Sequence, residues 1–576
     1  MRDITARGVH KRCGIEMPVM MLDESRNRAA GKFDLFLLCH NLKNLLSNDT
    51  EVGAKSNLKL TFHCAKFFAA HNSRVKFPAI ILFAASFAFA IQALAENSDL
   101  WGKRGELWNP AGRLPDFSYA GYHCGEKLIP NVLRGVSVKD FGATGDGIID
   151  DTQAFLKALN TVTNGAIQIP AGRYVITNIL DVTHSGVILR GAGADKTILY
   201  FPKPLMEIRP AWSATTTGRE TSAYSFGGGF VWFKGNFGER VLADVTAEAN
   251  RGEKVLQVST TKNLRIGQRV EIIEKDNPDN SLAVELYSGD AGSITNLNAT
   301  TFASIVVTIK KIDGDKISFD RPLRFAVKLQ WHPQIRSFTP TVKESGIENV
   351  RFEFPNVPYP GHFNEQGYNA IAFSEVSDCW ARNIIISNSD SGIFCGGRFC
   401  TIQNVTFTGT RAADMNSHCV GHHGFDFFGE DNLLTGFDYR VKFIHDLTVE
   451  HCAAGNVFAN GRGVDLCFDH HVCSPYENLF TDIDAGAGTR LWFCGGGNAL
   501  GKHSGARETF WNIRADKLQK LPPEGFGPPS MNFIALQTDL PSEKNSTNRW
   551  LESISPKKIA PGDLHAAQLA VRLRGK

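Results

Sequence analysis

The sequence predicts an all-β protein that folds as a right-handed parallel β-helix, with an N-terminal capping helix and a small inserted β subdomain. Three observations support this fold class. A polar residue recurs in front of apolar strands at intervals that fit the turns of a coil, a short amphipathic helix precedes these repeats, and a middle segment alternates like paired strands. At 576 residues, the chain is long enough for one elongated β fold.

The recurring polar residue is the main evidence for stacked coils. An Asn or Asp stands directly before an apolar strand, at intervals of 34, 21, 42, 32 and 34 residues, at Asn349, Asn383, Asn404, Asp446, Asn478 and Asn512. About 21 residues make one turn of a small β-helix, and 32–34 residues fit one turn with a longer loop. Successive turns then lie ~4.8 Å apart. Chance spacing in a β sandwich is the alternative interpretation.

The segment that precedes the repeats predicts a cap. An alternating strand begins at Val136 and runs into a turn rich in Gly and Asp. Asp150 or Asp151 then caps a short helix, whose apolar stripe consists of Ala154, Phe155, Ala158 and Leu159. The stripe needs a partner, and we expect it to cover the exposed end of the β stack.

The remaining chain divides by composition and pattern. We assign an N-terminal arm to 96–135, the first part of the β-helix with its capping helix to 136–239, an inserted β subdomain to 240–328, the main β-helix with its groove to 329–555, and a C-terminal cap to 556–576. In the last of these, Asp563 begins a helix that we expect to close the far end of the coil, with Leu564, Leu569 and Val571 facing inward.

Three stretches carry a resemblance to a known family. They are Val136–Gly147, Ile167–Tyr174 and Leu189–Gly193. Together they resemble the opening module of the pectate lyase superfamily, whose pectin-lyase-like members include polygalacturonase-like hydrolases, lyases and phage tailspikes. The resemblance covers about Val136 to Pro202 and implies a right-handed β-helix that acts on or binds polysaccharide. It transfers no catalytic residue.

A leader is predicted at 75–95. Arg74, Val75 and Lys76 precede an apolar run that ends in Ala93-Leu94-Ala95, which is the layout of a secretory signal. Residues 1–74 are then a non-native upstream extension, with translation starting near Val75, and the mature protein is secreted or periplasmic and free of the membrane. A transmembrane anchor is the alternative, because about 18 apolar residues nearly span a bilayer.

Cysteines and charge limit the function classes. Nine cysteines follow the leader, an odd number, so at least one thiol stays unpaired. Cys379 and Cys400 each precede the Asn of their turn by four residues, so we expect them to stack as free thiols or as a disulfide.

The net charge of +3 without basic blocks argues against nucleic acid as a partner. Gly191-Ala192-Gly193 lacks the third Gly and the helix of a dinucleotide loop.

Chemistry-bearing side chains are densest between Arg411 and His503, a segment that also contains His445. The candidate catalytic residues are His422, His423, Arg440, Asp465, Asp469, His470, His471 and Arg490. The candidate substrate-binding residues are Asp414, Asp426, Arg462, Trp492 and His503. We expect turns of the coil to align them along one groove, although any single His or Asp is more often a wall residue or a loop cap.

These residue types suit an enzyme that acts on an acidic, uronic-acid-containing polysaccharide. Elimination from a uronide needs a base for the C5 proton, a cation beside the carboxylate and a proton donor, which His and Arg supply. A polygalacturonase-like hydrolase would instead use paired carboxylates such as Asp465 and Asp469. A noncatalytic glycan-binding β-helix is the third reading, because it needs no convergent acid and base.

No cofactor is assigned from the sequence, and no metal ligand is assigned among the site residues. His422, His423, Asp469 and His471 are nevertheless of the types that ligate zinc or, in other mixtures, calcium. The oligomeric state is not indicated by the sequence.

Overall fold

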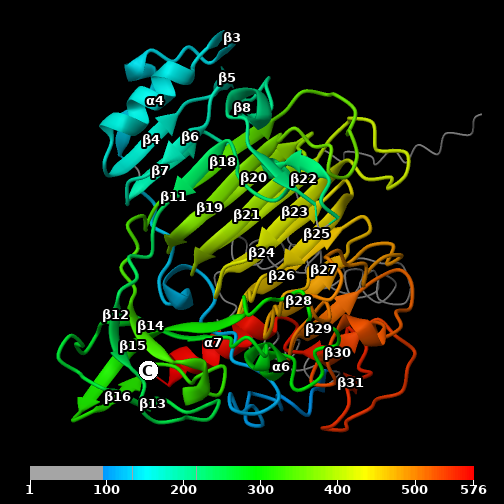
Figure 1. Cartoon of the computed structure of the whole chain (residues 1–576). Coiled ribbons are helices and arrows are strands. Elements are labelled where there is room, and N and C mark those ends of the chain that lie inside the picture. The colour runs from blue at the N-terminus through cyan, green and yellow to red at the C-terminus, as the bar shows by residue number, and fades with distance from the viewer. Residues whose placement is uncertain (1–94, 133, 216, 576) are drawn as a thin grey trace, which may run out of the picture. The chain divides into compact units, whose positions relative to one another are not determined.

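The computed structural model describes residues 95–132, 134–215 and 217–575. The predicted upstream extension and all of the predicted leader except Ala95 lie outside the described residues. Within the described part, strands dominate, and most of them stack in parallel along one axis (Figure 1). The predicted fold class, a right-handed parallel β-helix, is confirmed.

Two parallel sheets form the walls of the coil. The long sheet contains 15 strands of the described chain: β2 (Gly135–Ser137), β3 (Asp146–Asp150), β4 (Gly165–Ile169), β5 (Gly172–Val175), β7 (Val187–Gly191), β8 (Thr197–Tyr200), β18 (Gly346–Glu353), β20 (Trp380–Ser387), β22 (Thr401–Thr408), β24 (Leu433–Tyr439), β26 (Val457–Gly463), β28 (Leu479–Asp484), β29 (Thr509–Arg514), β30 (Asn532–Leu536) and β31 (Trp550–Glu552). The second sheet contains β6 (Leu180–Val182), β11 (Val231–Lys234), β19 (Asn369–Ser377), β21 (Ser391–Arg398), β23 (Gly421–Phe427), β25 (Phe443–Val449) and β27 (Phe468–His470).

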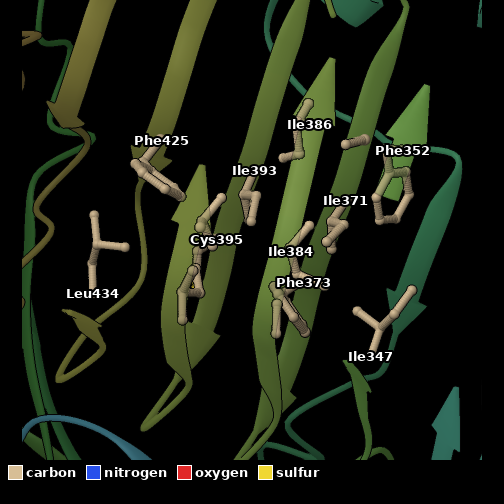
Figure 2. Close-up of a cluster of buried hydrophobic side chains, with 14 of the residues drawn as sticks. Ile347, Phe352, Ile371, Phe373, Ile384, Ile386, Ile393, Cys395, Phe425 and Leu434 are labelled. Carbon is tan, nitrogen blue, oxygen red and sulfur yellow. The ribbon is translucent and has the colours of Figure 1, made fainter. Parts of the chain in front are cut away.

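Apolar side chains stack turn upon turn between these sheets. On the long sheet, Val350 pairs with Ile384 and Ile384 pairs with Val405, all buried. On the second sheet, Ile371 pairs with Ile393 and Ile393 with Phe425 (Figure 2). Each such side chain contributes about 1.5–3 kcal/mol when fully buried, so the interior column stabilises the coil along its length.

The predicted Asn repeat forms an actual ladder on the long sheet. Asn383 Nδ2 donates to Asn349 Oδ1 at 2.9 Å, and Asn404 Nδ2 donates to Asn383 Oδ1 at 3.0 Å. Asn512 continues the same row and donates to Asp482. These residues have a left-handed backbone with φ of 53–61°, which Asn and Asp tolerate better than most residues. The prediction is therefore confirmed for four of its six positions.

The other two positions were assigned to the wrong row. Asn478 belongs to a second, buried ladder, in which the backbone N–H groups of Asn432, Asn456 and Asn478 donate to the side chains of Asn456, Asn478 and Glu508 at 2.9–3.0 Å. Asp446 lies on β25 in the second sheet and accepts from the backbone of Cys467. Asn478 directly precedes β28, whereas Asp446 lies within β25, and the sequence pattern of a polar residue before an apolar run does not distinguish these positions from the outer row.

Helix α4 (Thr152–Thr161) caps the first turns of the coil (Figure 1). Its buried Phe155 and Leu159 join the core with Ile167 and Tyr174, as the stripe predicted. Asp150, rather than Asp151, accepts from the N–H of Thr152 at 2.9 Å.

The inserted subdomain is an antiparallel sheet of six described strands, with helix α6 (Ser281–Leu286) beside it. The strands are β12 (Val241–Asp244), β13 (Val255–Gln257), β14 (Arg269–Lys275), β15 (Phe302–Asp313), β16 (Lys316–Phe319) and β17 (Gln334–Ser337), so the sheet extends past the predicted limit at 328. Buried ion pairs tie it to the coil: Arg321 and Arg324 bind Asp431, and Arg398 binds Glu271. A cavity of about 760 Å³ lies at this junction.

The C-terminal helix α7 (Leu564–Arg574) was expected to close the far end of the coil, but it packs on the side. Leu564 lies against Leu479 and Trp511 of the long sheet, together with Phe117 of the N-terminal arm. Gln568 bonds the arm at Phe117 and Pro115. The apolar stripe of α7 packs on the outer face of the long sheet because that face also presents apolar side chains. The N-terminal arm packs in the same layer.

Other short elements are α5 (Leu205–Ile208), the pair β9 (Trp212–Ala214) and β10 (Glu220–Ser222), and the pair β1 (Glu96–Asn97) and β32 (Ile559–Ala560).

All nine cysteines of the described chain are free thiols. Cys379 and Cys400 lie in adjacent turns and are buried, as expected for stacked thiols. None of the described helices is long and apolar enough to cross a membrane.

Candidate functional site

A cluster of histidines lies on three consecutive strands of the second sheet. His422 and His423 lie on β23, His445 lies on β25, and His471 directly follows β27. Parallel pairing sets His423 beside His445, with ring centroids 5.0 Å apart, and His471 lies a further 5.0 Å from His445. Residues separated by up to 49 positions thus come together because the coil repeats.

Asp469 of β27 is the anionic centre of the cluster. Its Oδ2 lies 2.9 Å from His471 Nδ1 and 3.1 Å from His445 Nδ1, and it accepts from Thr448 Oγ1 at 3.0 Å. Its other oxygen accepts from the N–H of Gly495 at 2.7 Å. The carboxylate is fully buried, yet the hydrogen bonds from His471, Thr448 and Gly495 satisfy it, so it remains ionised.

Asp469 and His471 shift each other's pKa. Burial alone would raise the pKa of Asp469, but His445 and His471 outweigh it and hold the pKa well below its usual value. Burial alone would likewise lower the pKa of His471, but Asp469 raises it to about 9. His471 is therefore a protonated imidazolium at neutral pH.

Three of the surrounding imidazoles, those of His362, His422 and His423, are neutral at neutral pH. Burial, together with neighbouring histidines, lowers the pKa of His422 and His423 well below the usual value. Desolvation by the surrounding side chains, followed by electrostatic interaction with His445 and His471, also lowers the pKa of His362, a residue of the loop before β19 whose side chain stays partly in contact with solvent. The site thus combines one cationic imidazole with several neutral ones.

Two further carboxyl groups lie beneath the imidazoles. Asp426 Oδ2 is 3.6 Å from His423 Nδ1, and burial followed by the charge of Glu450 raises its pKa well above the usual value. Glu365 Oε1 is 3.4 Å from His422 Nδ1, and burial raises its pKa to about 7 against the opposing hydrogen bond from Tyr359.

Only part of the cluster reaches the surface. His362 is exposed, the His471 side chain is 23% exposed, and Phe493 is 49% exposed and stacks over His445. Asp426 and Asp469 are at most 1% exposed. A molecule that binds here meets imidazole and aromatic rings first.

The structure brings five predicted site residues together: His422, His423, Asp426, Asp469 and His471. His470, although adjacent in sequence, points to the interior. Its Nε2 lies 2.9 Å from Glu508 Oε1 and its ring packs on Phe480. Alternation along β27 puts neighbouring side chains on opposite faces, so His470 and His471 are separated.

Asp465 and Arg490 hold the chain near the cluster and do not join it. Asp465 accepts from the N–H and Oγ1 of Thr489. Arg490 is ion-paired with Asp446 and donates to the carbonyl of Phe443. Both side chains therefore have partners of their own: Asp465 binds the loop at Thr489, and Arg490 binds Asp446 and the backbone.

The other candidates lie elsewhere. Arg440 and Arg462 are exposed on the long sheet and share Asp438. Asp414 caps its own loop at Ser417. Two more were expected to bind substrate: Trp492 is half-buried against Phe510 and Phe533, and His503 bonds the carbonyl of His470.

Two site residues were missed. His445 lies inside the segment from Arg411 to His503, but the sequence analysis assigned no role to it. Its position opposite His423 follows from the register of β23 and β25, and a correct prediction of that register would have found it. His362 lies about 60 residues earlier in a loop, and its ring is 4.5 Å from that of His422. No sequence spacing indicates that approach.

Two groups of side chains within the described residues are placed to hold an ion. They are His362 with His422 and His445, and His445 with Asp469 and His471, and the ligand atoms of each group lie within 4.8 Å of one another.

The stacked parallel sheets define the fold class of the described chain, a right-handed parallel β-helix. Residues 135–205 match the sequence profile of a family described as rhamnogalacturonase A/epimerase, pectate lyase-like. The resemblance to the pectate lyase superfamily, predicted from the same stretch, is confirmed.

Curated relatives match short stretches. Mannuronan C5-epimerase AlgE1 of Azotobacter vinelandii is 32% identical over 124 residues, which is 20% of this chain and 8% of the relative. The pre-neck appendage protein of Bacillus phage B103 is 37% identical over 67 residues, 12% of this chain and 7% of the relative. The chain therefore spans less than a tenth of the length of these relatives.

Two solved structures are similar over longer stretches. The tailspike protein gp49 of Pseudomonas phage LKA1 is 14% identical with a TM-score of 0.38, over 69% of this chain and 66% of the tailspike. The A-module of mannuronan C-5 epimerase AlgE4 of Azotobacter vinelandii is 11% identical with a TM-score of 0.27, over 69% of this chain and 81% of the module.

Proposed function

We propose that this protein is an enzyme that acts on an acidic, uronate-containing polysaccharide and cleaves it by β-elimination at the histidine cluster. The observation that carries the proposal is the Asp469–His471 pair. It presents a protonated imidazole at the surface beside neutral imidazoles, which is the combination that carboxylate-assisted proton removal requires.

Each group has a role in this proposal. His471 donates to the uronate carboxylate or to the leaving oxygen, where negative charge develops in the reaction. Asp469 positions His471 and keeps it protonated. A neutral imidazole of the cluster accepts the C5 proton, and the pKa of His423, lowered by burial, keeps that ring free of a proton.

The test is incubation of the protein with polygalacturonate and with alginate. Elimination creates an unsaturated product with ultraviolet absorbance, hydrolysis creates reducing ends without it, and epimerisation changes the C5 configuration without cleavage, which NMR detects. We expect absorbance to rise with the native protein and to fall about 100-fold or more with His471→Gln. His184→Gln, an exposed histidine outside the cluster, is the matched control and keeps activity.

No product from either glycan would refute the proposal. C5 inversion without cleavage would keep the proton abstraction and replace the elimination step, and it would match the activity printed in the name of the epimerase relative.

Hydrolysis is the second candidate, because one observation favours it. The pKa of Asp426 is raised and that of Asp469 is lowered, which is how environments separate an acid from a base. Asp426 and Asp469 each pair with Thr448, so their Cα positions lie two strand spacings apart, about 9.6 Å. Side chains on two such positions can hold carboxyl groups about 6.5–9.5 Å apart, the range of inverting glycosidases. Their burial beneath the imidazoles favours elimination instead.

Export remains part of the proposal. It rests on residues 74–95, where charged residues precede an apolar run that ends in small residues. Export also fits the proposed substrate, because an extracellular polysaccharide is accessible only to an exported enzyme.

A further inference from the structure

We propose that His362, His422 and His445 form a binding site for one divalent transition-metal ion of the zinc class. The inference concerns the proposed catalytic site but does not depend on its reaction. The three residues come from a loop and from two neighbouring strands, and their nitrogen atoms lie within 4.8 Å of one another. Three imidazoles suit zinc, nickel or cobalt, whereas calcium requires oxygen ligands.

The orientation of two rings supports the site. His445 Nδ1 faces Asp469 Oδ2 at 3.1 Å, and His422 Nδ1 faces Glu365 Oε1 at 3.4 Å. The opposite nitrogen, Nε2, of each ring is thereby left for an ion. A carboxylate behind each imidazole is the usual arrangement around a metal-ligating histidine, because it fixes the tautomer and raises the basicity of the ligand.

An unsatisfied nitrogen atom is the second, independent observation. Nε2 of His445, the nitrogen that faces away from Asp469, is buried and makes no hydrogen bond within the described residues. Buried polar atoms nearly always have a partner, and each exception calls for an explanation. An ion bound at Nε2 of His445 gives that nitrogen a partner. The proton of the ring then lies on Nδ1, which faces Asp469.

Access and coordination number also fit. His362 is exposed, so an ion can enter from the solvent side, and the two other ligands lie beneath it. Three protein ligands leave an open coordination position, which is typical of catalytic rather than structural zinc sites. The charge of an ion beside His471 would also help to bind a uronate carboxylate, while His423 stays outside the ligand set as a proton acceptor.

The test measures binding without any glycan. The full chain, stripped with a chelator, is titrated with Zn²⁺ by calorimetry and with Co²⁺ by visible absorbance. We expect one ion per chain, and a loss of affinity of at least 100-fold in His362→Ala, which removes an exposed ligand. Glu365→Gln and Asp469→Asn should weaken binding about 10- to 100-fold. His184→Ala is the control and should bind normally.

The absence of binding at micromolar Zn²⁺, or unchanged binding in His362→Ala, would overturn the site. This result is independent of the proposed function, since the metal-free protein can be assayed separately for elimination. Zinc binding without any glycan product would refute the elimination and leave the ion site standing.

Discussion

At the scale of single residues, the central feature is a buried carboxylate that keeps a partly exposed imidazole protonated. Asp469 makes four polar contacts, and the pKa of its partner His471 rises to about 9 as a result. Because Asp469 raises the pKa of His471 more than Glu450 does, the pH dependence of activity reports mainly the Asp469–His471 pair.

The first prediction concerns this pH dependence. In the native protein, the acidic form of His471 is present below a pH of about 9, so activity that needs it should fall as the pH rises through that value. In Asp469→Asn the carboxylate is lost, and the alkaline limb should move down towards the ordinary histidine value of about 6.5. A pH–rate profile of both proteins measures the shift. An unchanged alkaline limb would show that His471 does not act as the acid.

Sequence reasoning recovered part of this site. The residue types and the segment from Arg411 to His503 were predicted, and five of the named side chains do meet. His470 was grouped with His471 because the two are adjacent, yet strand alternation separates them. His362 could not be predicted, because its approach depends on the path of a loop and not on any repeat.

At the scale of the secondary-structure elements, two polar ladders run along the long sheet and act differently. The outer ladder contains Asn383 and also Gly436, both with a left-handed backbone, so the position selects for backbone conformation. The inner ladder contains Asn456, whose side chain accepts from the backbone of Asn432 and donates to the carbonyl of Gly429. It satisfies buried backbone groups.

The second prediction separates these roles. Asn456→Ala leaves the buried N–H of Asn432 without its acceptor and should lower the free energy of unfolding by about 1–3 kcal/mol or more. Asn383→Gly is the matched control, because Gly436 already occupies an equivalent position, and it should lower stability by much less. Chemical denaturation measures both. Equal losses would mean that the inner ladder has no special role.

The sequence predicts that a polar residue recurs in successive turns, but it does not predict which of the two ladders each residue joins. Asn349, Asn383, Asn404 and Asn512 share one row, while Asn478 precedes its strand in the same way but belongs to the inner ladder. The sequence shows that an Asn recurs, and only the register of the strands shows which face each one occupies.

At the scale of the whole described molecule, the insert is fixed to the coil by buried charges. Arg321 Nη1 lies 2.7 Å from Asp431 Oδ2, and Arg324 pairs with the same carboxylate. All three side chains are at most 5% exposed. Such pairs add little net stability when complete, but removal of one partner leaves an uncompensated buried charge.

The third prediction follows from that asymmetry. Asp431→Ala should destabilise the protein by about 3–5 kcal/mol, because the buried Arg321 loses its carboxylate partner and the buried Arg324 keeps only the more distant Glu430. Asp313→Ala removes an exposed partner of Lys311 in the same insert and should change stability by less than about 1 kcal/mol. Thermal unfolding of the two variants compares them. Equal stability would show that the insert is held by its apolar contacts alone.

The general architecture was predictable because a coil imposes a period, whereas the packing of its ends and sides was not. The capping helix lies where its apolar stripe indicated, but α7 packs beside Trp511 and not at the end of the coil. The apolar stripe of an amphipathic helix predicts that the helix packs on an apolar surface. A β-helix has several such surfaces, and the stripe does not specify which one the helix covers.

The central claim is that an acidic glycan binds over β23, β25 and β27. A crystal structure of His423→Gln, which removes the proposed base and keeps the Asp469–His471 pair, soaked with an oligogalacturonate or an alginate oligosaccharide tests it most directly. The account predicts a sugar carboxylate within hydrogen-bond distance of His471, with a ring against Phe493. A sugar seated instead in the cavity beside Arg398 and Glu430, with the histidine cluster empty, would contradict it.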